Sequence, residues 1–189
     1  MQRRLTVGRY RAVDLSLLAV ILIVFETILV RAAREWFPAE PYTVSCVAAV
    51  TAVVMVRWGP WCAVHAVIGG IVTVLVSRGN AQQFLIYGIG NLAALAVLPL
   101  ERRWGWEKLR KDILVNFLFA FLVLLAMQAG RTLVALALGA LSGDLLIFVT
   151  TDSVTYIFTL AILWIVSRLD GMLEDQIHYL NRLSQETER

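Results

Sequence analysis

The sequence predicts an all-α integral membrane protein: a compact bundle of six transmembrane helices followed by a short amphipathic helix. Three observations support this fold class. Of the 189 residues, 59% are hydrophobic and 16% are charged, and the mean hydropathy is +0.74. A water-soluble domain of this size cannot bury so much apolar surface, so the lipid bilayer is the expected solvent. The apolar residues also fall into six long runs.

These runs give the predicted spans. They cover residues 13 to 33, 42 to 56, 60 to 76, 83 to 100, 113 to 138 and 145 to 168. A transmembrane helix needs about 20 residues, so six of them form one domain over residues 1–168. The second and third runs are short, and only Arg57-Trp58-Gly59-Pro60 separates them. Gly allows a sharp turn and Pro suits the first position of a helix, so a helical hairpin is expected there.

The basic residues predict that both ends of the chain lie in the cytoplasm. With the N-terminus inside, thirteen of the seventeen Lys and Arg residues flank the spans on the cytoplasmic side, and three lie on the opposite side. Such an excess is typical of cytoplasmic loops. The first run resembles a signal peptide, but it reaches spanning length and ends in charged residues, so a retained helix is expected.

Residues 169–189 are predicted to form a cytoplasmic amphipathic helix. Its apolar residues recur at a spacing of three or four, at Leu169, Leu173, Ile177, Leu180 and Leu183, and charged residues occupy the other face. The acidic balance disfavours an anionic membrane surface. We expect the helix to pack on a protein or on this chain's own loops, and a solvated tail helix is the alternative.

Three ionisable side chains inside the predicted spans need a reason, because each costs on the order of 2.5 to 3.5 kcal/mol near the centre of a span. They are Glu26, Arg131 and Asp152. In the predicted topology each lies about seven residues from the outer end of its helix, at a depth of roughly 10 Å. The three side chains are therefore expected at one level.

Other polar residues fall in the same outer half of the bundle. Gln128 lies one turn from Arg131, and Tyr87 and Asn91 share a face of the fourth helix. A polar pocket open to the outside, lined by the first, fourth, fifth and sixth spans, would account for them. The candidate substrate-binding residues are Glu26, Arg131, Asp152, Gln128, Asn91, Tyr87, Thr155 and Trp36. The alternative is structural: a carboxylate neutralises Arg131, or the Arg131 side chain extends to the outer headgroups.

No catalytic motif accompanies these residues. The sequence has no GxxxxGK[ST] loop, so the chain itself is not expected to hydrolyse ATP. It has no serine nucleophile elbow, histidine–carboxylate pair or zinc signature. We expect neither an enzyme nor a bound cofactor. A small intramembrane enzyme that uses Glu26 or Asp152 as acid or base is the least favoured interpretation, because a nucleophile or metal is missing.

Several features are similar to the substrate-binding (S) component of energy-coupling factor (ECF) transporters. They are Arg57-Trp58-Gly59-Pro60-Trp61 followed by Ala66, Gly69 and Gly70, and Tyr87-Gly88-Ile89-Gly90-Asn91 ahead of a basic loop. The likeness covers roughly residues 10–168. It implies a multi-pass protein of the bacterial cytoplasmic membrane that captures a vitamin or similar micronutrient in an outward-facing pocket, with no nucleic-acid partner.

The resemblance also implies protein partners, namely a transmembrane coupling protein and two cytoplasmic ATPases. The family commonly docks the coupling protein on an Ala-x-x-x-Ala motif in the first helix. The nearest match here is Ala12 with Ser16, so these are the expected docking residues. The histidine that metal-transporting members carry after the initiator Met is replaced by Met1-Gln2-Arg3, which disfavours nickel or cobalt.

The alternative function is a multi-span scaffold protein of the bacterial cell-elongation (rod-shape) machinery, which is similar in length and hydropathy. Its amphipathic tail would recruit cytoplasmic partners. A scaffold does not need three ionisable side chains at one depth, so the polar residues favour a binding protein.

Overall fold

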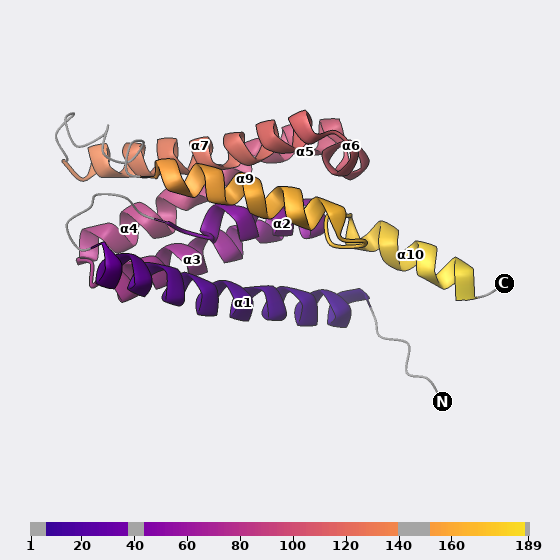
Figure 1. Ribbon diagram of the computed structural model, residues 1–189, viewed down its shortest axis with the longest axis horizontal. Coiled ribbons are helices and arrows are strands. Elements are labelled where there is room, and N and C mark those ends of the chain that lie inside the picture. The colour runs from indigo at the N-terminus through magenta and orange to yellow at the C-terminus, as the bar shows by residue number, and fades with distance from the viewer. Residues whose placement is uncertain (1–6, 38–43, 140–151, 188–189) are drawn as a thin grey trace.

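The computed structural model describes residues 7–37, 44–139 and 152–187, and every regular element in these ranges is a helix. The helices are α1 (Val7–Trp36), α2 (Val47–Trp58), the 3-10 helix η1 (Gly59–Trp61), α3 (Cys62–Ser77), α4 (Ala81–Gly90), the 3-10 helix η2 (Asn91–Val97), α5 (Leu98–Trp104), α6 (Trp106–Lys111), α7 (Ile113–Ala137), α9 (Ser153–Arg168) and α10 (Gln176–Thr187). The longer helices run along one axis, and α1 begins at the end where α10 leaves the bundle (Figure 1). The expected all-α class is confirmed for the described residues.

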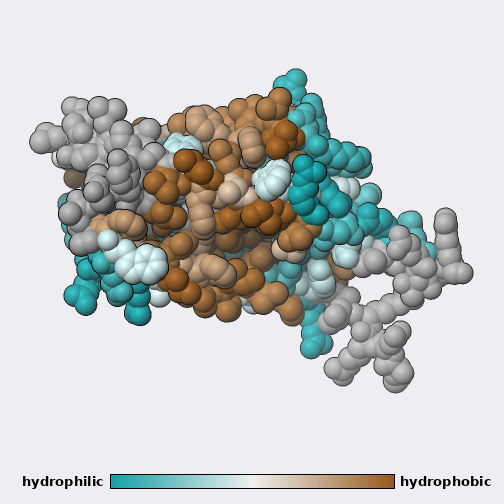
Figure 2. All heavy atoms as spheres, viewed as in Figure 1, coloured by the Kyte–Doolittle hydropathy of each residue, from teal (hydrophilic) through white to brown (hydrophobic). Residues whose placement is uncertain are grey.

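Among the described residues, four helical stretches are long and apolar enough to cross a membrane. They are Val7–Trp36, Val47–Ser77, Ala81–Trp104 and Ile113–Ala137, and Val154–Arg168 is a shorter apolar helix. Figure 2 shows a broad hydrophobic band between hydrophilic ends on the face in view. Many large apolar side chains are exposed in these helices, which a soluble domain rarely tolerates. The chain thus has the features of a membrane protein.

The stretch Val47–Ser77 reverses direction at Gly59, as the sequence predicted. Gly59 has a φ of 58°, and Pro60 follows it in η1. The two helices then lie side by side, because a Cβ added to Gly69 would lie 2.6 Å from Cγ1 of Val47. α2 has 12 residues and α3 has 16, so each is shorter than the roughly 30 Å hydrocarbon core. The stretch is a hairpin of two short helices.

Glycines let α4 approach both of its neighbours closely. A Cβ added to Gly130 of α7 would collide with the carbonyl oxygen of Gly90, and one added to Gly90 would lie 2.6 Å from Cα of Arg131. On the other side, a Cβ on Gly70 of α3 would collide with the carbonyl oxygen of Tyr87. Small residues allow such backbone contacts between membrane helices. They place Tyr87 and Arg131 next to each other.

The C-terminal tail is divided into two parts. α9 ends at Arg168, and α10 begins only at Gln176. Gly171, with a φ of 69°, lies between them. The expectation of one amphipathic helix is therefore wrong for residues 169–175. A glycine lies in the left-handed region there, and backbone carbonyl groups accept hydrogen bonds from another side chain instead of from the helical backbone.

That other side chain belongs to a buried ion pair at the tail end of the bundle. Arg57 donates to both carboxylate oxygens of Asp14, at 2.7 and 3.0 Å, and Trp58 Nε1 donates to Asp14 at 2.6 Å. Nη1 of Arg57 also donates to the carbonyls of Gly171 and Met172, at 2.8 and 3.0 Å. This cluster connects α1, the α2–α3 hairpin and the tail, so the tail packs on its own chain here.

Candidate binding cavity

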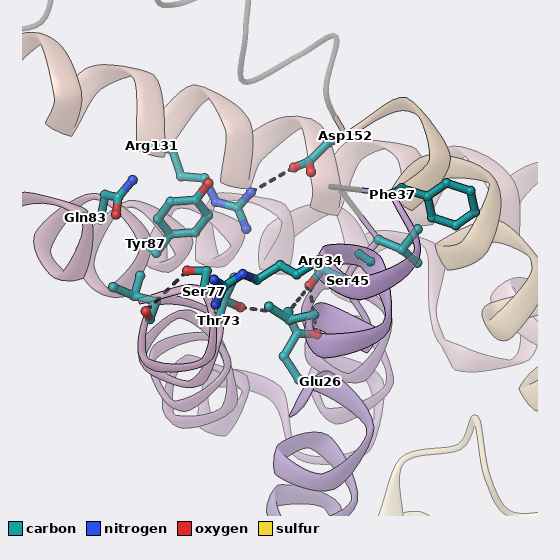
Figure 3. A pocket seen from close by; sticks show the side chains of 14 residues that line it. Glu26, Arg34, Phe37, Ser45, Thr73, Ser77, Gln83, Tyr87, Arg131 and Asp152 are labelled. Atoms are coloured by element: carbon teal, nitrogen blue, oxygen red, sulfur yellow. Dashed lines mark hydrogen bonds and ion pairs between the residues drawn. The ribbon is translucent and has the colours of Figure 1, made fainter. Parts of the chain in front are cut away.

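A cavity of about 430 Å³ lies at the end of the bundle opposite the tail (Figure 3). Small-molecule sites in proteins typically measure about 300 to 1,000 Å³. Side chains from α1, α3, α4 and α7, the segment before α2 and the residue before α9 line it: Glu26, Val30, Ala33, Arg34, Phe37, Val44, Ser45, Thr73, Val74, Ser77, Gln83, Tyr87, Arg131 and Asp152. Apolar, neutral polar and charged groups therefore converge on one space.

Glu26 is fully buried on α1 and is held by neutral donors. Its Oε1 lies 2.7 Å from the hydroxyl of Thr73 and 2.9 Å from that of Ser45. Its Oε2 lies 2.9 Å from the backbone N–H of Cys46, 3.3 Å from the thiol of Cys46 and 3.0 Å from the hydroxyl of Ser45. The carboxylate thus ties α1 to both helices of the hairpin. Within the described parts of the chain, Glu26 forms no ion pair.

Arg131 of α7 is neutralised on the opposite wall of the cavity. Its Nη1 donates to Oδ2 of Asp152 at 2.9 Å, and Gln128 Nε2 donates to the same oxygen. Its Nε donates to Oδ1 of Asn91 at 2.7 Å. The ring of Tyr87 lies 4.6 Å from the guanidinium carbon, a distance at which a cation is attracted to the ring face. The guanidinium is therefore fixed in position by Asp152, Asn91 and Tyr87, and Gln128 supports the carboxylate of Asp152.

The structure brings part of the expected residue set to the cavity wall. The wall contains Glu26, Tyr87, Arg131 and Asp152. Asn91 and Gln128 lie behind the wall, because each is bonded to a wall residue and is itself buried. Figure 3 shows Arg131 and Asp152 pointing at each other, with Glu26 on another side of the cavity. A role of these residues in binding a substrate stays a prediction.

Two further expected residues, besides Asn91 and Gln128, do not line the cavity. Thr155 is buried, and its hydroxyl accepts a hydrogen bond from the backbone N–H of Ser45 at 3.2 Å, so it supports the wall from outside. Trp36 is 73% exposed and lines a separate apolar hollow of about 370 Å³ between α1 and the start of α9. Trp36 was expected here because an aromatic residue bordered the first outer loop, but its side chain faces away.

Asp152 directly precedes α9, which begins at Ser153. The sixth span was expected to begin at residue 145, and residues 145–151 lie outside the described ranges. The expected depth of Asp152, about seven residues into that span, therefore stays a prediction. Its contact with Arg131 defines its place instead.

Sequence reasoning missed the contribution of the third helix and of the segment before the second. Thr73 and Ser77 of α3 and Ser45 before α2 line the cavity, although the expected pocket used only the first, fourth, fifth and sixth spans. One signal was present: Thr73 and Ser77 are four residues apart and share a helix face. Neutral hydroxyl groups in a span carry little energetic cost, so the cost criterion did not select Thr73 and Ser77 as candidate site residues.

Three arginines lie beside the mouth of the cavity. Arg31, Arg34 and Arg78 line a hollow in the surface together with Glu35, and Arg34 also lines the cavity. Nη1 of Arg34 donates to the carbonyl of Val76 at 2.9 Å in an exposed position. The mouth is therefore positively charged where it meets the solvent.

The expected docking residues lie at the other end of α1. Ala12 and Ser16 are both exposed, and their four-residue spacing puts them on one face of the helix. Small residues on an exposed helix face allow another helix to approach.

Comparisons with protein-family models, with curated proteins and with solved structures found no match. The function is therefore argued from the cavity and its surroundings.

Proposed function

We propose that this chain is the substrate-capture subunit of an ECF-type uptake transporter, which binds a vitamin or similar micronutrient with high affinity from outside the cell. The observation that carries the proposal is a cavity lined by charged, polar and apolar side chains at one end of an apolar bundle. Ionisable groups are costly at membrane depth and mark substrate pathways in many membrane proteins. A cavity with few converging polar groups is typical of a small-molecule site.

The proposed topology has six crossings with both termini in the cytoplasm. The crossings are α1, α2, α3, α4 with η2 and α5, α7, and α9. The excess of Lys and Arg near the tail end supports placing that end inside. The cavity then opens to the exterior of a bacterial cytoplasmic membrane, where a capture subunit meets its substrate.

Energy for release has to come from other subunits in this proposal, because the sequence has no phosphate-binding loop for ATP. A transmembrane coupling protein and two cytoplasmic ATPases would supply it. Ala12 and Ser16 lie near the tail end of α1 and offer a small-residue surface to a coupling helix. A scaffold for cell elongation would need docking surfaces but no cavity lined by charged groups, so the cavity favours capture.

Native mass spectrometry of the full chain, purified in mild detergent, tests the proposal. We expect one small molecule bound per chain. Ala33→Trp should abolish its binding, because Ala33 lines the cavity and the larger side chain would fill it. Val13→Trp is the matched control on the same helix, because Val13 is exposed on its apolar surface. A chain that carries no solute and co-purifies with a cell-elongation protein would contradict capture and support the scaffold.

A further inference from the structure

Two cations and two carboxylates line the cavity, but only one cation and one carboxylate are in contact. Four side chains of the lining carry formal charges: Glu26, Arg34, Arg131 and Asp152. Arg131 and Asp152 neutralise each other at 2.9 Å. Arg34 lies at the exposed mouth, where water and salt screen its charge. The carboxylate of Glu26 remains buried without a cation beside it in the described parts of the chain.

The hydrogen bonds of Glu26 orient its carboxylate but do not remove its charge. All its partners are neutral groups: two hydroxyls, one thiol and one backbone N–H. An ionised carboxylate accepts about four hydrogen bonds. A buried charge that is hydrogen-bonded but unpaired still carries a desolvation cost, and a cation brought into the cavity would offset that cost.

Oε1 of Glu26 contacts two hydroxyl groups, but the protons of both hydroxyls are shared with other acceptors. The hydroxyl of Ser45 has a single proton but lies within 3.0 Å of both Oε1 and Oε2. The hydroxyl of Thr73 is also shared, because it lies 2.9 Å from the carbonyl of Gly69 as well as 2.7 Å from Oε1. Oε2 has the backbone N–H of Cys46 in addition. Oε1 is therefore the oxygen with capacity for a further donor.

We propose that the cavity recognises a ligand with a cationic nitrogen group, an ammonium or an amidinium, which donates to Oε1 of Glu26 beside the hydroxyls of Ser45 and Thr73. This inference rests on the proposed function and names the chemical class of its substrate. An N–H donor with a positive charge forms a stronger bond to a carboxylate than a neutral donor does. The rest of the ligand would extend toward the mouth, away from the guanidinium of Arg131.

Arg131 is the cation of the lining that could anchor a carboxylate of a ligand, and its contacts argue against that role. Its Nε and Nη1 are already engaged by Asn91 and Asp152, and the ring of Tyr87 covers it. An acidic ligand would have to compete with a buried carboxylate. A basic ligand at Glu26 would break no ion pair in the described parts of the chain, because Arg34, the other cation of the lining, donates to the carbonyl of Val76 instead.

A matched pair of probes tests the proposal on the full chain in detergent. Benzamidinium and benzamide have nearly the same shape, but only the first is a cation. We expect wild-type protein to bind benzamidinium at least about tenfold more tightly than benzamide by isothermal titration calorimetry, as a charge-assisted hydrogen bond predicts. Glu26→Gln should remove that preference. Glu35→Gln, which neutralises an exposed carboxylate on the same helix, should keep it.

The wild-type comparison needs no variant, so poor folding of Glu26→Gln leaves the test intact. Equal affinity for the two probes, binding of neither, or an unchanged preference in folded Glu26→Gln would overturn the inference. The solute found by native mass spectrometry separates this result from the capture function. A bound solute without a cationic nitrogen would contradict the cationic ligand but not the capture function. A chain that binds neither solute nor probe would contradict both.

Discussion

Replacing Arg57 with Met should destabilise the protein by about 3 to 5 kcal/mol, the usual cost of removing one partner of a buried ion pair. The side chain of Arg57 is 6% exposed and that of Asp14 is 13% exposed. The substitution removes two hydrogen bonds to Asp14 and two to the carbonyls of Gly171 and Met172. Among the described residues, it leaves the Asp14 carboxylate with the indole N–H of Trp58 as its hydrogen-bond donor.

The free energy of unfolding can be measured by titrating detergent-solubilised protein with SDS and following the fluorescence of its six tryptophans. Arg110→Met is the matched control, because Arg110 forms an ion pair of 2.9 Å with Asp170 in which the side chains are 27% and 75% exposed. This pair should contribute less than about 1 kcal/mol. Arg57→Lys should fall between them, since an ammonium keeps the charge but not the planar fork. Equal losses for Arg57→Met and Arg110→Met would refute the reasoning.

Two further substitutions test the packing of the bundle by the same measurement. Gly130→Ala should cost about 1 to 3 kcal/mol, because the new Cβ would collide with the carbonyl of Gly90, whereas Gly88→Ala should cost far less because a Cβ there meets nothing within 4 Å. Truncation after Gly171 should destabilise the chain because it removes Leu173, which is 1% exposed in the core. Truncation after Asn181 keeps that residue and should be nearly neutral, so equal losses from the two truncations would contradict this account of the tail.

The all-α membrane class was predictable because the amino-acid composition of a membrane protein differs from that of a soluble one. Long apolar runs with few charges are what a lipid solvent requires, and they predict a helical membrane protein. The hairpin was predictable for a local reason, since Gly59 and Pro60 can reverse the chain without help from distant residues. The structure of the tail was not predictable in this way. Residues 169–183 have an α-helical periodicity, but the contact that accompanies the break in the helix comes from Arg57, more than a hundred residues earlier in the sequence.

In the candidate site, the ionisable residues within the spans were predictable from the sequence. Glu26, Arg131 and Asp152 stand out because ionisable side chains in a span are costly, and the structure places all three on one cavity. Their partners did not stand out. Ser45 and Thr73 are neutral and common in apolar helices, and only the packing of α2 and α3 against α1 brings them to Glu26.

The two buried ion pairs lie at opposite ends of the bundle, and each is satisfied within the chain. Asp14 and Arg57 fix the tail end, while Arg131 and Asp152 fix one wall of the cavity. Glu26 follows neither pattern, since both of its oxygens accept hydrogen bonds from neutral donors and no cation pairs with it in the described parts of the chain. A positive group beside this carboxylate would offset its desolvation cost. The space beside Glu26 is the cavity, so in the inference proposed above the ligand supplies that group.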